Sequence, residues 1–372
     1  MRPPIVVGGA LANKAGSGGE AWVRMSWVGG LQQLGFDVWF VEQADHPTGE
    51  QVAYFDRTVA EFGLGERAVL MTADGPLRGV GLGTLVDVAR EAALVNISGH
   101  IDAPALFPEF RRRVYVDIDP GFTQSWYADG VGGHRLDGHD VFATIGERIG
   151  RSGCPIPTCG VEWVHVRQPV VLDDWPQITA SHFDRFTTVA SWRGPFGPVT
   201  IDGETFGSKV REFRRFLAMP TTTGHRFELA LAIDSGDAAD RVALDATGWE
   251  LVDPRHVADD PSAFRRYVQG SGAEFSVAQG VYVHTGSGWF SDRTVRYLAS
   301  GRPALVQATG FERSLPTGTG LLAFANMAEA VAGAHDIACR YDEHVAAARA
   351  IAVDHFDAAI VLARFCEQCG IG

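Results

Sequence analysis

The sequence predicts a two-domain α/β protein in which each domain is a doubly wound, mostly parallel sheet covered by helices on both faces. The 372 residues include 46% hydrophobic and 21% charged residues, which is enough apolar material to fill two ordinary cores. Short apolar runs that end in Gly, Asp or Pro alternate with helical patterns along most of the chain. Between residues 150 and 174 Pro, Cys and Gly are frequent and no period is sustained, so we place the domain boundary there.

The first half of the chain begins with a strand, a glycine-rich loop, a helix and a second strand. Residues 5–7 form a short apolar run, and apolar residues then recur at helical spacing until Gly35. The run 36–41 is typical of a buried strand, and it ends in Glu42. Further short strands are expected at 94–97, 114–117 and 141–145. Residues 1–168 are therefore predicted to form an N-terminal, Rossmann-like domain.

A second alternating series occupies residues 169–341 and predicts a second Rossmann-like domain. Its expected strands are 187–191, 227–233, 249–252, 281–284, 304–307 and 321–324, and its expected helices are 208–218, 262–269 and 292–300. Two consecutive doubly wound halves imply a cleft between them. The Ala-rich run from Asp342 to Phe365 is expected to be helical, so that residues 342–372 pack back towards the first domain.

The charge balance limits the partners that are expected. Lys and Arg number 32 against 45 Asp and Glu, a formal charge of −13 that would repel a phosphate backbone. We therefore expect neither a nucleic acid partner nor binding to an anionic membrane. No stretch reaches the roughly 18 uncharged residues of a membrane helix, so we expect no integral membrane segment and a cytoplasmic protein.

The five cysteines are an odd number in a chain without a recognisable signal peptide, which favours reduced thiols over a disulfide framework. Cys154 with Cys159 and Cys366 with Cys369 could together offer four thiolates to zinc, but the first spacing is loose for such a site. Buried or idle thiols are the favoured interpretation, and no metal site is expected.

The run Gly16-Ser-Gly18-Gly19-Glu20-Ala21 fits the G-x-G-x-x-A pattern of a dinucleotide-binding turn. Glu42 ends the next strand, where such an enzyme holds a ribose. The pattern should begin directly after the first strand, whereas several residues intervene here. A glycine loop that faces an anion or a substrate is therefore favoured over an NAD or FAD site, and a plain flexible turn stays open.

A stronger pattern runs through residues 281–303, where a predicted strand, a glycine turn and a helix follow one another. At the carboxyl end of a parallel strand, such a turn presents free backbone N–H groups and the positive end of a helix dipole to a diphosphate. Gly286 and Gly288 lie in the turn. Asp292 and Arg293 begin the helix, where Arg293 could pair with a phosphate and Asp292 could bind sugar hydroxyls or simply cap the helix.

Three stretches in the later part of the chain form a further sequence pattern: Ser291-Asp-Arg-Thr-Val-Arg-Tyr-Leu-Ala-Ser-Gly-Arg-Pro303, Gln307 with Thr309-Gly310-Phe311, and Leu315-Pro-Thr-Gly-Thr-Gly-Leu-Leu-Ala-Phe324. Together they resemble the donor-binding half of bacterial GT-B glycosyltransferases. The order of elements agrees over nearly the whole chain, and the motifs agree over residues 187–360. Many members of that fold bind the nucleotide ribose with a Glu five residues before the Gly, but here that position is Arg296.

This resemblance implies a GT-B fold, in which two Rossmann-like domains face each other across a cleft and a C-terminal helix crosses back to the first domain. It also implies that the second domain binds a nucleotide sugar and that the first brings the acceptor, with Gly16, Gly18 and Gly19 in an acceptor or phosphate loop. A basic residue is expected at the diphosphate, and Lys209 fits because the chain has only one other lysine. The implied donor-binding set is Ser191, Trp192, Arg193, Lys209, Gly286, Gly288, Trp289, Ser291, Asp292 and Arg293.

The catalytic base is expected in the loops that follow strands of the first domain. His100 follows one strand, with Asp102 close enough in sequence to orient it. Asp119 follows another strand and Glu20 follows the glycine loop, so three candidates stay open. Asp117-Ile-Asp119 has the spacing of a metal-binding Asp-x-Asp motif, but the two-lobed organisation argues against that use.

The sequence thus predicts a metal-independent hexosyl- or deoxysugar transferase that moves a sugar from a nucleotide diphosphate sugar to a hydroxyl of a small-molecule or glycan acceptor. No cofactor is expected besides the donor as co-substrate. Two alternatives stay open: a dinucleotide-dependent oxidoreductase that uses Gly16–Ala21, and a non-catalytic GT-B scaffold subunit.

Overall fold

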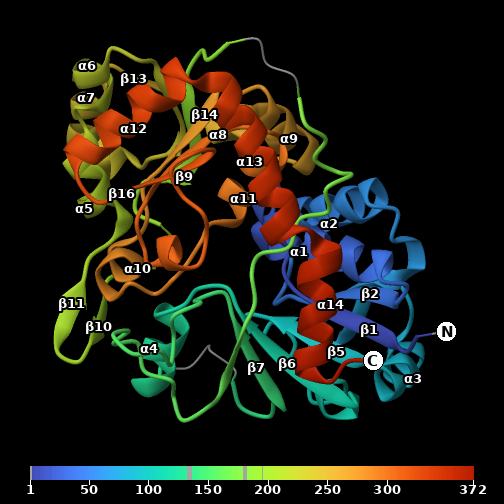
Figure 1. Cartoon of the computed structure of the whole chain (residues 1–372). Helices are drawn as coiled ribbons and strands as arrows, with labels where there is room; N and C mark the ends of the chain where they lie inside the picture. Colours follow the sequence, from blue (N-terminus) through green and yellow to red (C-terminus); the bar gives the residue numbers. More distant parts are fainter. Residues whose placement is uncertain (1, 132–135, 179–181, 195) are drawn as a thin grey trace. The chain divides into compact units, whose positions relative to one another are not determined.

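The computed structural model describes residues 2–131, 136–178, 182–194 and 196–372, and it divides into two units (Figure 1). Unit 1 comprises Met1–Gly146, Pro157–Val171 and Asp357–Gly372, and unit 2 comprises Glu147–Ile156 and Leu172–Phe356. The sequence predicts a single boundary after residue 168. In the structure each unit is assembled from separate stretches of chain, which composition along the chain does not reveal.

Unit 1 contains an eight-stranded sheet in the order β4-β3-β2-β1-β5-β6-β7-β8. Its strands are β1 (Pro4–Gly8), β2 (Asp37–Gln43), β3 (Ala68–Thr72), β4 (Gly75–Arg78), β5 (Ala93–Ile97), β6 (Arg112–Asp117), β7 (Val141–Thr144) and β8 (Trp163–His165). Every neighbouring pair is parallel except β3 with β4. The strand order reverses between β1 and β5, and ligands of such sheets bind beyond the carboxyl ends of the strands at this point.

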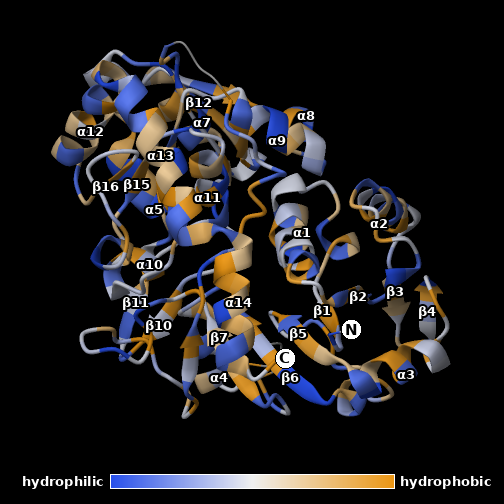
Figure 2. Ribbon diagram, turned by 45° about the vertical axis from the view of Figure 1, so that its right-hand side comes forward, coloured by the Kyte–Doolittle hydropathy of each residue, from blue (hydrophilic) through white to orange (hydrophobic). Residues whose placement is uncertain are grey.

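Helices cover this sheet because their apolar sides pack on buried strands. They are α1 (Gly18–Gln33), α2 (Gly49–Glu61), α3 (Leu82–Glu91), α4 (Phe122–Ala128) and α14 (Ala358–Cys369). Figure 2 shows hydrophobic and hydrophilic residues side by side on the outer helix α2, as expected for a half-buried helix. Helix α14 packs on α1, where a Cβ at Gly30 would lie 2.6 Å from Leu362 and Trp27 meets Phe365 edge to face.

Unit 2 contains a six-stranded parallel sheet in the order β13-β12-β9-β14-β15-β16. Its strands are β9 (Phe186–Ser191), β12 (Phe227–Ala232), β13 (Trp249–Val252), β14 (Ala273–Ser276), β15 (Ala304–Gln307) and β16 (Leu321–Phe324). The first strand of the unit, β9, lies between β12 and β14, so the switch point of this sheet falls between β9 and β14.

The rest of unit 2 consists of a hairpin and nine helices among the residues that the structure describes. The hairpin is β10 (Val199–Ile201) with β11 (Glu204–Phe206), and the helices are α5 (Lys209–Phe213), α6 (Met219–Thr223), α7 (Ala238–Ala246), α8 (Pro254–Val257), α9 (Pro261–Gln269), α10 (Gly280–Thr285), α11 (Asp292–Ala299), α12 (Met327–Cys339) and α13 (Tyr341–Phe356). In Figure 1 the hairpin lies beside α10, with which its second strand is in contact.

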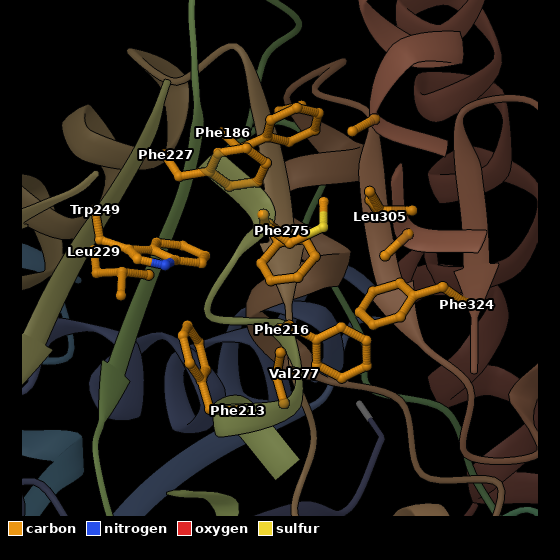
Figure 3. Packing of buried hydrophobic residues seen from close by; sticks show 14 of the residues in the cluster. Phe186, Phe213, Phe216, Phe227, Leu229, Trp249, Phe275, Val277, Leu305 and Phe324 are labelled. Atoms are coloured by element: carbon orange, nitrogen blue, oxygen red, sulfur yellow. The ribbon is translucent and has the colours of Figure 1, made fainter. Parts of the chain in front are cut away.

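An aromatic core fixes α5 against the sheet of unit 2 (Figure 3). Phe275 of β14 stacks on Phe324 of β16 with ring centres 5.2 Å apart, and Phe213 of α5 packs on the edge of the same cluster at Trp249. Phe216 continues the cluster with its ring edge against Phe324. Burying each large apolar side chain contributes about 1.5–3 kcal/mol, so the helix that begins at Lys209 is firmly anchored.

The structure confirms the α/β class and most predicted elements, but it corrects the segment 281–284. The β-branched and aromatic residues of Val281-Tyr-Val predicted a strand there. They form helix α10 instead, and the strand precedes them as β14. The charged Glu in Ala273-Glu-Phe-Ser276 argued against a buried strand at this position in the sequence. In the structure the strand is fully buried, and the Glu carboxylate is paired with an arginine inside the unit.

Two predicted helices are also shorter than expected. The segment 208–218 ends its α-helix at Phe213 and continues as a tight 3-10 turn, Arg214–Phe216. The run 342–365 is broken at Asp357, whose side chain accepts a hydrogen bond from Ala359 N at 2.9 Å and so starts α14 as a new helix. Among the described residues, no helix is both long and apolar enough to span a bilayer.

Candidate functional site

Arg293 stands at the switch point of unit 2, where it joins the ends of two neighbouring strands. Its Nε donates to Glu274 Oε1 at 2.6 Å, its Nη1 to Val189 O at 2.8 Å and its Nη2 to Ser276 Oγ at 2.8 Å. Glu274 is fully buried and the Arg293 side chain is 13% exposed. The guanidinium is therefore held in one orientation, with one hydrogen on each terminal nitrogen not used in these bonds.

Lys209 is the second cation at this end of the sheet. It is the first residue of α5 and is half-buried, and no hydrogen bond or ion pair joins its ammonium group to another described residue. Burial and the charge of Arg293 lower the pKa of Lys209 to about 7, although Glu274 acts in the opposite direction. Two cations and one carboxylate give this end of the unit 2 sheet a net positive charge, which favours an anionic ligand.

Close backbone packing sets the position of Lys209. A Cβ at Gly280 would lie 2.7 Å from the carbonyl oxygen of Gly207, two residues before Lys209. Only a glycine allows α10 to approach this segment so closely. The turn at Gly207 thus brings the lysine beside α10.

The expected phosphate-binding role of the glycine turn at 286–289 is not supported by its hydrogen bonds. Gly286 N donates to Val283 O, Ser287 N to Tyr282 O, Gly288 N to Thr309 O at 2.7 Å and Trp289 N to Ser287 Oγ. A Cβ at Gly288 would lie 3.0 Å from Arg148 N, so packing against the segment 147–156 explains this glycine. The prediction of free N–H groups in the turn is wrong, because the turn satisfies them internally.

Three other expected donor-site residues lie in the core or at the surface of unit 2. Trp192 is 2% exposed in the hydrophobic core, and its Nε1 donates to Asp240 at 2.8 Å. Its ring therefore does not face a ligand, contrary to the prediction. Arg193 is exposed and pairs with Asp237, while Ser191 ends β9 with an exposed side chain.

The remaining expected residues lie around the start of α11. Trp289 is half-buried and stacks on Tyr282 with ring centres 4.4 Å apart. Ser291 is buried directly before the helix, and Asp292 accepts a hydrogen bond from Arg296 at 3.0 Å. Arg296 itself is 1% exposed and lies over the Trp175 ring, so the residue at the family's ribose position points into the unit.

In unit 1, Glu42 shapes the loop that follows β1. Its carboxylate accepts hydrogen bonds from the backbone N–H groups of Leu11, Ala12 and Asn13 at 2.8, 2.7 and 2.8 Å. Glu42 is fully buried, and these three bonds occupy both of its oxygens. A ribose therefore finds no free carboxylate there, and the dinucleotide alternative loses the contact on which it rested. Because the 3-10 turn that it caps ends at Lys14, Glu42 also positions that lysine.

The glycine loop leads into α1. Gly16 is exposed with a φ of 80°, and Gly18 and Gly19 are the first residues of the helix. Glu20 follows them and pairs with the buried Arg24. Burial opposes ionisation of Glu20, but the charges of Arg24, Lys14 and His100 outweigh it and lower its pKa.

Asp119 follows β6 on a loop organised by Asp117. The fully buried Asp117 carboxylate accepts hydrogen bonds from Asp119 N, Thr123 Oγ1, Gln124 Nε2 and Thr144 Oγ1 at 2.7–3.0 Å. Protein donors thus occupy the oxygens that an Asp-x-Asp metal site would need. Within the described ranges, no group of three His, Cys, Asp or Glu side chains has a metal-binding arrangement.

Burial raises the pKa of Asp119 to about 7, and the negative charges of Asp117 and Glu20 contribute. Asp119 therefore interacts with Glu20, which in turn interacts with His100. The three residues that the sequence proposed as catalytic lie in one electrostatic cluster, which follows strands β1, β5 and β6. These strands are neighbours in the sheet, so the loops after them end at the same edge.

Asn96, which is not among the residues predicted from the sequence, supports the His100 loop. Its side chain forms two hydrogen bonds with the backbone of Ile101, from Nδ2 to the carbonyl oxygen at 2.9 Å and from the amide N–H to Oδ1 at 3.0 Å. The turn between them needs positive φ values at Ser98 and Gly99. A polar residue inside the apolar run 94–97 was the available signal. Asp102, expected to orient His100, accepts a hydrogen bond from Gln43 Nε2 at 2.6 Å.

No protein-family profile and no curated protein sequence matches the chain, whereas solved structures do. An alpha-glucosyltransferase in complex with UDP matches with a TM-score of 0.60 at 9% identity, over 99% of this chain and 100% of that one. The chain has the GT-B fold. Anabaena HepE in complex with UDP-glucose matches with a TM-score of 0.61 at 11% identity, over 99% of this chain and 100% of that chain. AviGT4, a glycosyltransferase involved in avilamycin A biosynthesis, gives 0.56 at 13% identity, over 99% and 97%. At these identities the likeness to other GT-B proteins is one of fold.

Proposed function

We infer that the protein is a glycosyltransferase that moves a sugar from a nucleoside diphosphate sugar to an acceptor hydroxyl. Unit 2 binds the donor and unit 1 activates the acceptor. The observation that carries this proposal is the pair of Lys209 and Arg293 at the switch point of the unit 2 sheet. Two cations at the carboxyl ends of β9 and β14 stand where parallel sheets bind nucleotides.

The same pair accounts for the chemistry on the donor side. As the bond between the anomeric carbon and the diphosphate oxygen breaks, the diphosphate leaves with the bonding electrons and its negative charge grows. Arg293 is already oriented by three hydrogen bonds, so it stabilises this charge without reorganising. Lys209 adds a second positive charge, since a bound diphosphate raises its pKa above about 7.

On the acceptor side we assign the proton transfer to Asp119. The acceptor oxygen bonds to the anomeric carbon while its proton passes to the Asp119 carboxylate. A base with a pKa of about 7 is about half ionised at neutral pH, and its carboxylate form is basic enough to take a proton. The charge of Glu20 helps to raise the pKa of Asp119, and His100 interacts with Glu20, so both residues influence the reaction through Asp119.

The similar structures suggest which ligands to test first. They include complexes with UDP and with UDP-glucose, and one alpha-glucosyltransferase is in complex with UDP-glucose and DNA. For this chain we propose a uridine-type donor as the first candidate and a small-molecule or glycan acceptor. A formal charge of −13 disfavours a nucleic acid acceptor. A cytoplasmic location and a metal-independent reaction belong to the same proposal.

A thermal-shift panel of UDP, GDP, dTDP, CMP and NAD tests the donor class. A ligand at 100 times its dissociation constant stabilises the protein by about 2.7 kcal/mol, so a cognate nucleoside diphosphate should raise the melting temperature clearly. A shift with NAD alone would favour the oxidoreductase alternative. Slow release of the nucleoside diphosphate from its sugar ester, with water as the acceptor, would separate an enzyme from a scaffold subunit.

A further inference from the structure

The side chain of Gln279 is buried without a hydrogen-bond partner. The residue is 9% exposed, and its Oε1 is inaccessible to solvent and accepts no hydrogen bond. Its amide nitrogen donates to no described residue either. Leaving a buried amide unsatisfied is costly, so native proteins seldom keep one without a reason.

Gln279 lies on the short segment that joins β14 to α10. It comes three residues after Ser276, which accepts a hydrogen bond from Arg293, and it immediately precedes α10. The next residue, Gly280, packs against Gly207 on the segment that leads into Lys209. The chain segment that carries Gln279 is therefore in contact with Arg293 at one end and with the residues that precede Lys209 at the other.

Packing alone fixes this amide in place. A Cβ at Gly194 would lie 3.0 Å from the Gln279 Nε2 and 3.2 Å from its Oε1, so the amide group lies over the backbone of Gly194. Gly194 has a φ of 79°, which favours glycine. The contact orients the amide while leaving both of its polar atoms without a protein partner.

A second buried glutamine nearby shows the contrast. Gln307 Oε1 accepts a hydrogen bond from Ala278 N at 3.1 Å, and its Nε2 donates to Glu212 at 2.8 Å. Both polar ends of that amide are satisfied within unit 2, as expected for a structural residue. Gln279, three positions after the end of β14, has no such partners.

We propose that Gln279 hydrogen-bonds the uncharged part of the nucleoside diphosphate sugar whose phosphates lie on Lys209 and Arg293. This inference rests on the proposed function. The ligand group must donate an N–H or O–H to Oε1 and offer an acceptor to Nε2. Ribose or sugar hydroxyls and the edge of a nucleobase all have this chemistry, and Gln279 would make the site specific for the compound that presents it.

The test compares ligand binding by the full chain and by Gln279→Met, which keeps the length of the side chain but removes both polar atoms. We expect Gln279→Met to bind UDP or UDP-glucose about 5- to 100-fold more weakly, the range for one or two neutral hydrogen bonds, and to bind inorganic pyrophosphate as the parent does. Lys209→Ala should weaken all three ligands. Thermal stability should be unchanged or higher in Gln279→Met and lower in the matched control Gln307→Met.

Further ligands identify the group that Gln279 contacts. An equal loss for UDP, GDP and ADP would assign it to the ribose, a loss for one nucleotide alone to the base, and a loss confined to UDP-glucose to the sugar. Parental affinity of Gln279→Met for every nucleotide, or an equal loss for pyrophosphate, would overturn the inference and leave the proposed function standing. If the parent protein binds no nucleoside diphosphate, the proposed function fails and this inference fails with it.

Discussion

Arg293 Nε lies 2.6 Å from Oε1 of Glu274, and this carboxylate is fully buried. The pair fixes a cation at the point where strands β9 and β14 diverge, which is where a doubly wound sheet binds its ligand. A guanidinium that is oriented in the free protein loses little freedom when a phosphate arrives. The ion pair thus belongs both to the fold of unit 2 and to its proposed chemistry.

Replacing Arg293 should affect stability and binding together. Arg293→Ala leaves Glu274 buried without its partner, which we expect to lower the free energy of unfolding by about 3–5 kcal/mol in urea titrations. Nucleoside diphosphate binding should weaken by about 1.5–3 kcal/mol, the range for hydrogen bonds to a charged group. The double change Arg293→Met with Glu274→Gln should recover stability but not binding. Recovery of both would show that Arg293 has only a structural role.

Lys209 should make donor binding depend on pH. In the free protein its pKa is about 7, so it loses its charge as the pH rises further, whereas a bound diphosphate keeps it protonated. Affinity should therefore fall by up to tenfold per pH unit between about pH 7.5 and 9.5, with proton uptake on binding seen by calorimetry in two buffers. Lys209→Arg stays charged and should lose this dependence. A flat profile in the parent protein would contradict the assignment.

The same shift has a consequence for stability, with the sign set by proton binding. An exposed lysine titrates near 10.4, so between about pH 7 and 10 the unfolded chain binds a proton that the folded chain does not. This residue alone therefore makes the free energy of unfolding rise with pH in that window. Lys209→Met should remove the rise, because methionine does not titrate.

Asp119 should control the acidic side of the activity profile. Its pKa is raised to about 7, so turnover should increase as the pH rises through this value and the carboxylate ionises. Asp119→Asn should lower turnover by roughly 10²–10⁴ with donor binding intact. Glu20→Gln should move the midpoint to lower pH, because the charge of Glu20 helps to raise the pKa of Asp119.

An unchanged midpoint in Glu20→Gln would mean that another group titrates. His100→Ala serves as the comparison, since His100 interacts with Glu20 and follows the neighbouring strand β5. A loss of turnover larger than that of Asp119→Asn would make His100 the base. If neither change costs more than tenfold, analysis of the product anomer by NMR decides whether the reaction retains configuration.

Glu42 should be required for the fold and not for a dinucleotide. Glu42→Gln keeps one carbonyl oxygen but places an N–H₂ group against backbone donors, so we expect a loss of about 1–3 kcal/mol in stability. Binding of NAD or FAD should be absent from the parent and the variant alike. Stability equal to the parent would mean that the loop after β1 does not depend on this carboxylate.

The sequence was most informative where local pattern and burial agree. The apolar runs at 5–7 and 304–307 are central strands, and a lysine among many arginines directed attention to Lys209. The sequence was misleading at 281–284, where the β-branched residues predict a strand but form helix α10. The preceding segment, β14, supplies the strand at this place in the sheet. Local strand propensity does not determine which of two adjacent segments pairs into the sheet.

Long-range partners explain the other differences. The residues near Glu42 in the sequence do not indicate that its carboxylate accepts hydrogen bonds from three backbone N–H groups some 30 positions earlier. The glycine turn at 286–289 resembled a phosphate loop, but its N–H groups bond within unit 2 and its tight packing comes from Arg148. Gln279 could not be singled out either, since an unsatisfied amide is a property of its surroundings.

Calorimetric titration of nucleoside diphosphates into the parent protein and into Lys209→Ala/Arg293→Met/Glu274→Gln tests the central claim most directly. We expect at least one of UDP, GDP, CDP, ADP and dTDP to bind the parent protein far more tightly than its nucleoside does, because the phosphates supply the charge that the two cations attract. The folded triple variant should lose this difference. If no nucleoside diphosphate binds the parent protein, or if the triple variant binds as well as the parent does, unit 2 does not bind its ligand through Lys209 and Arg293.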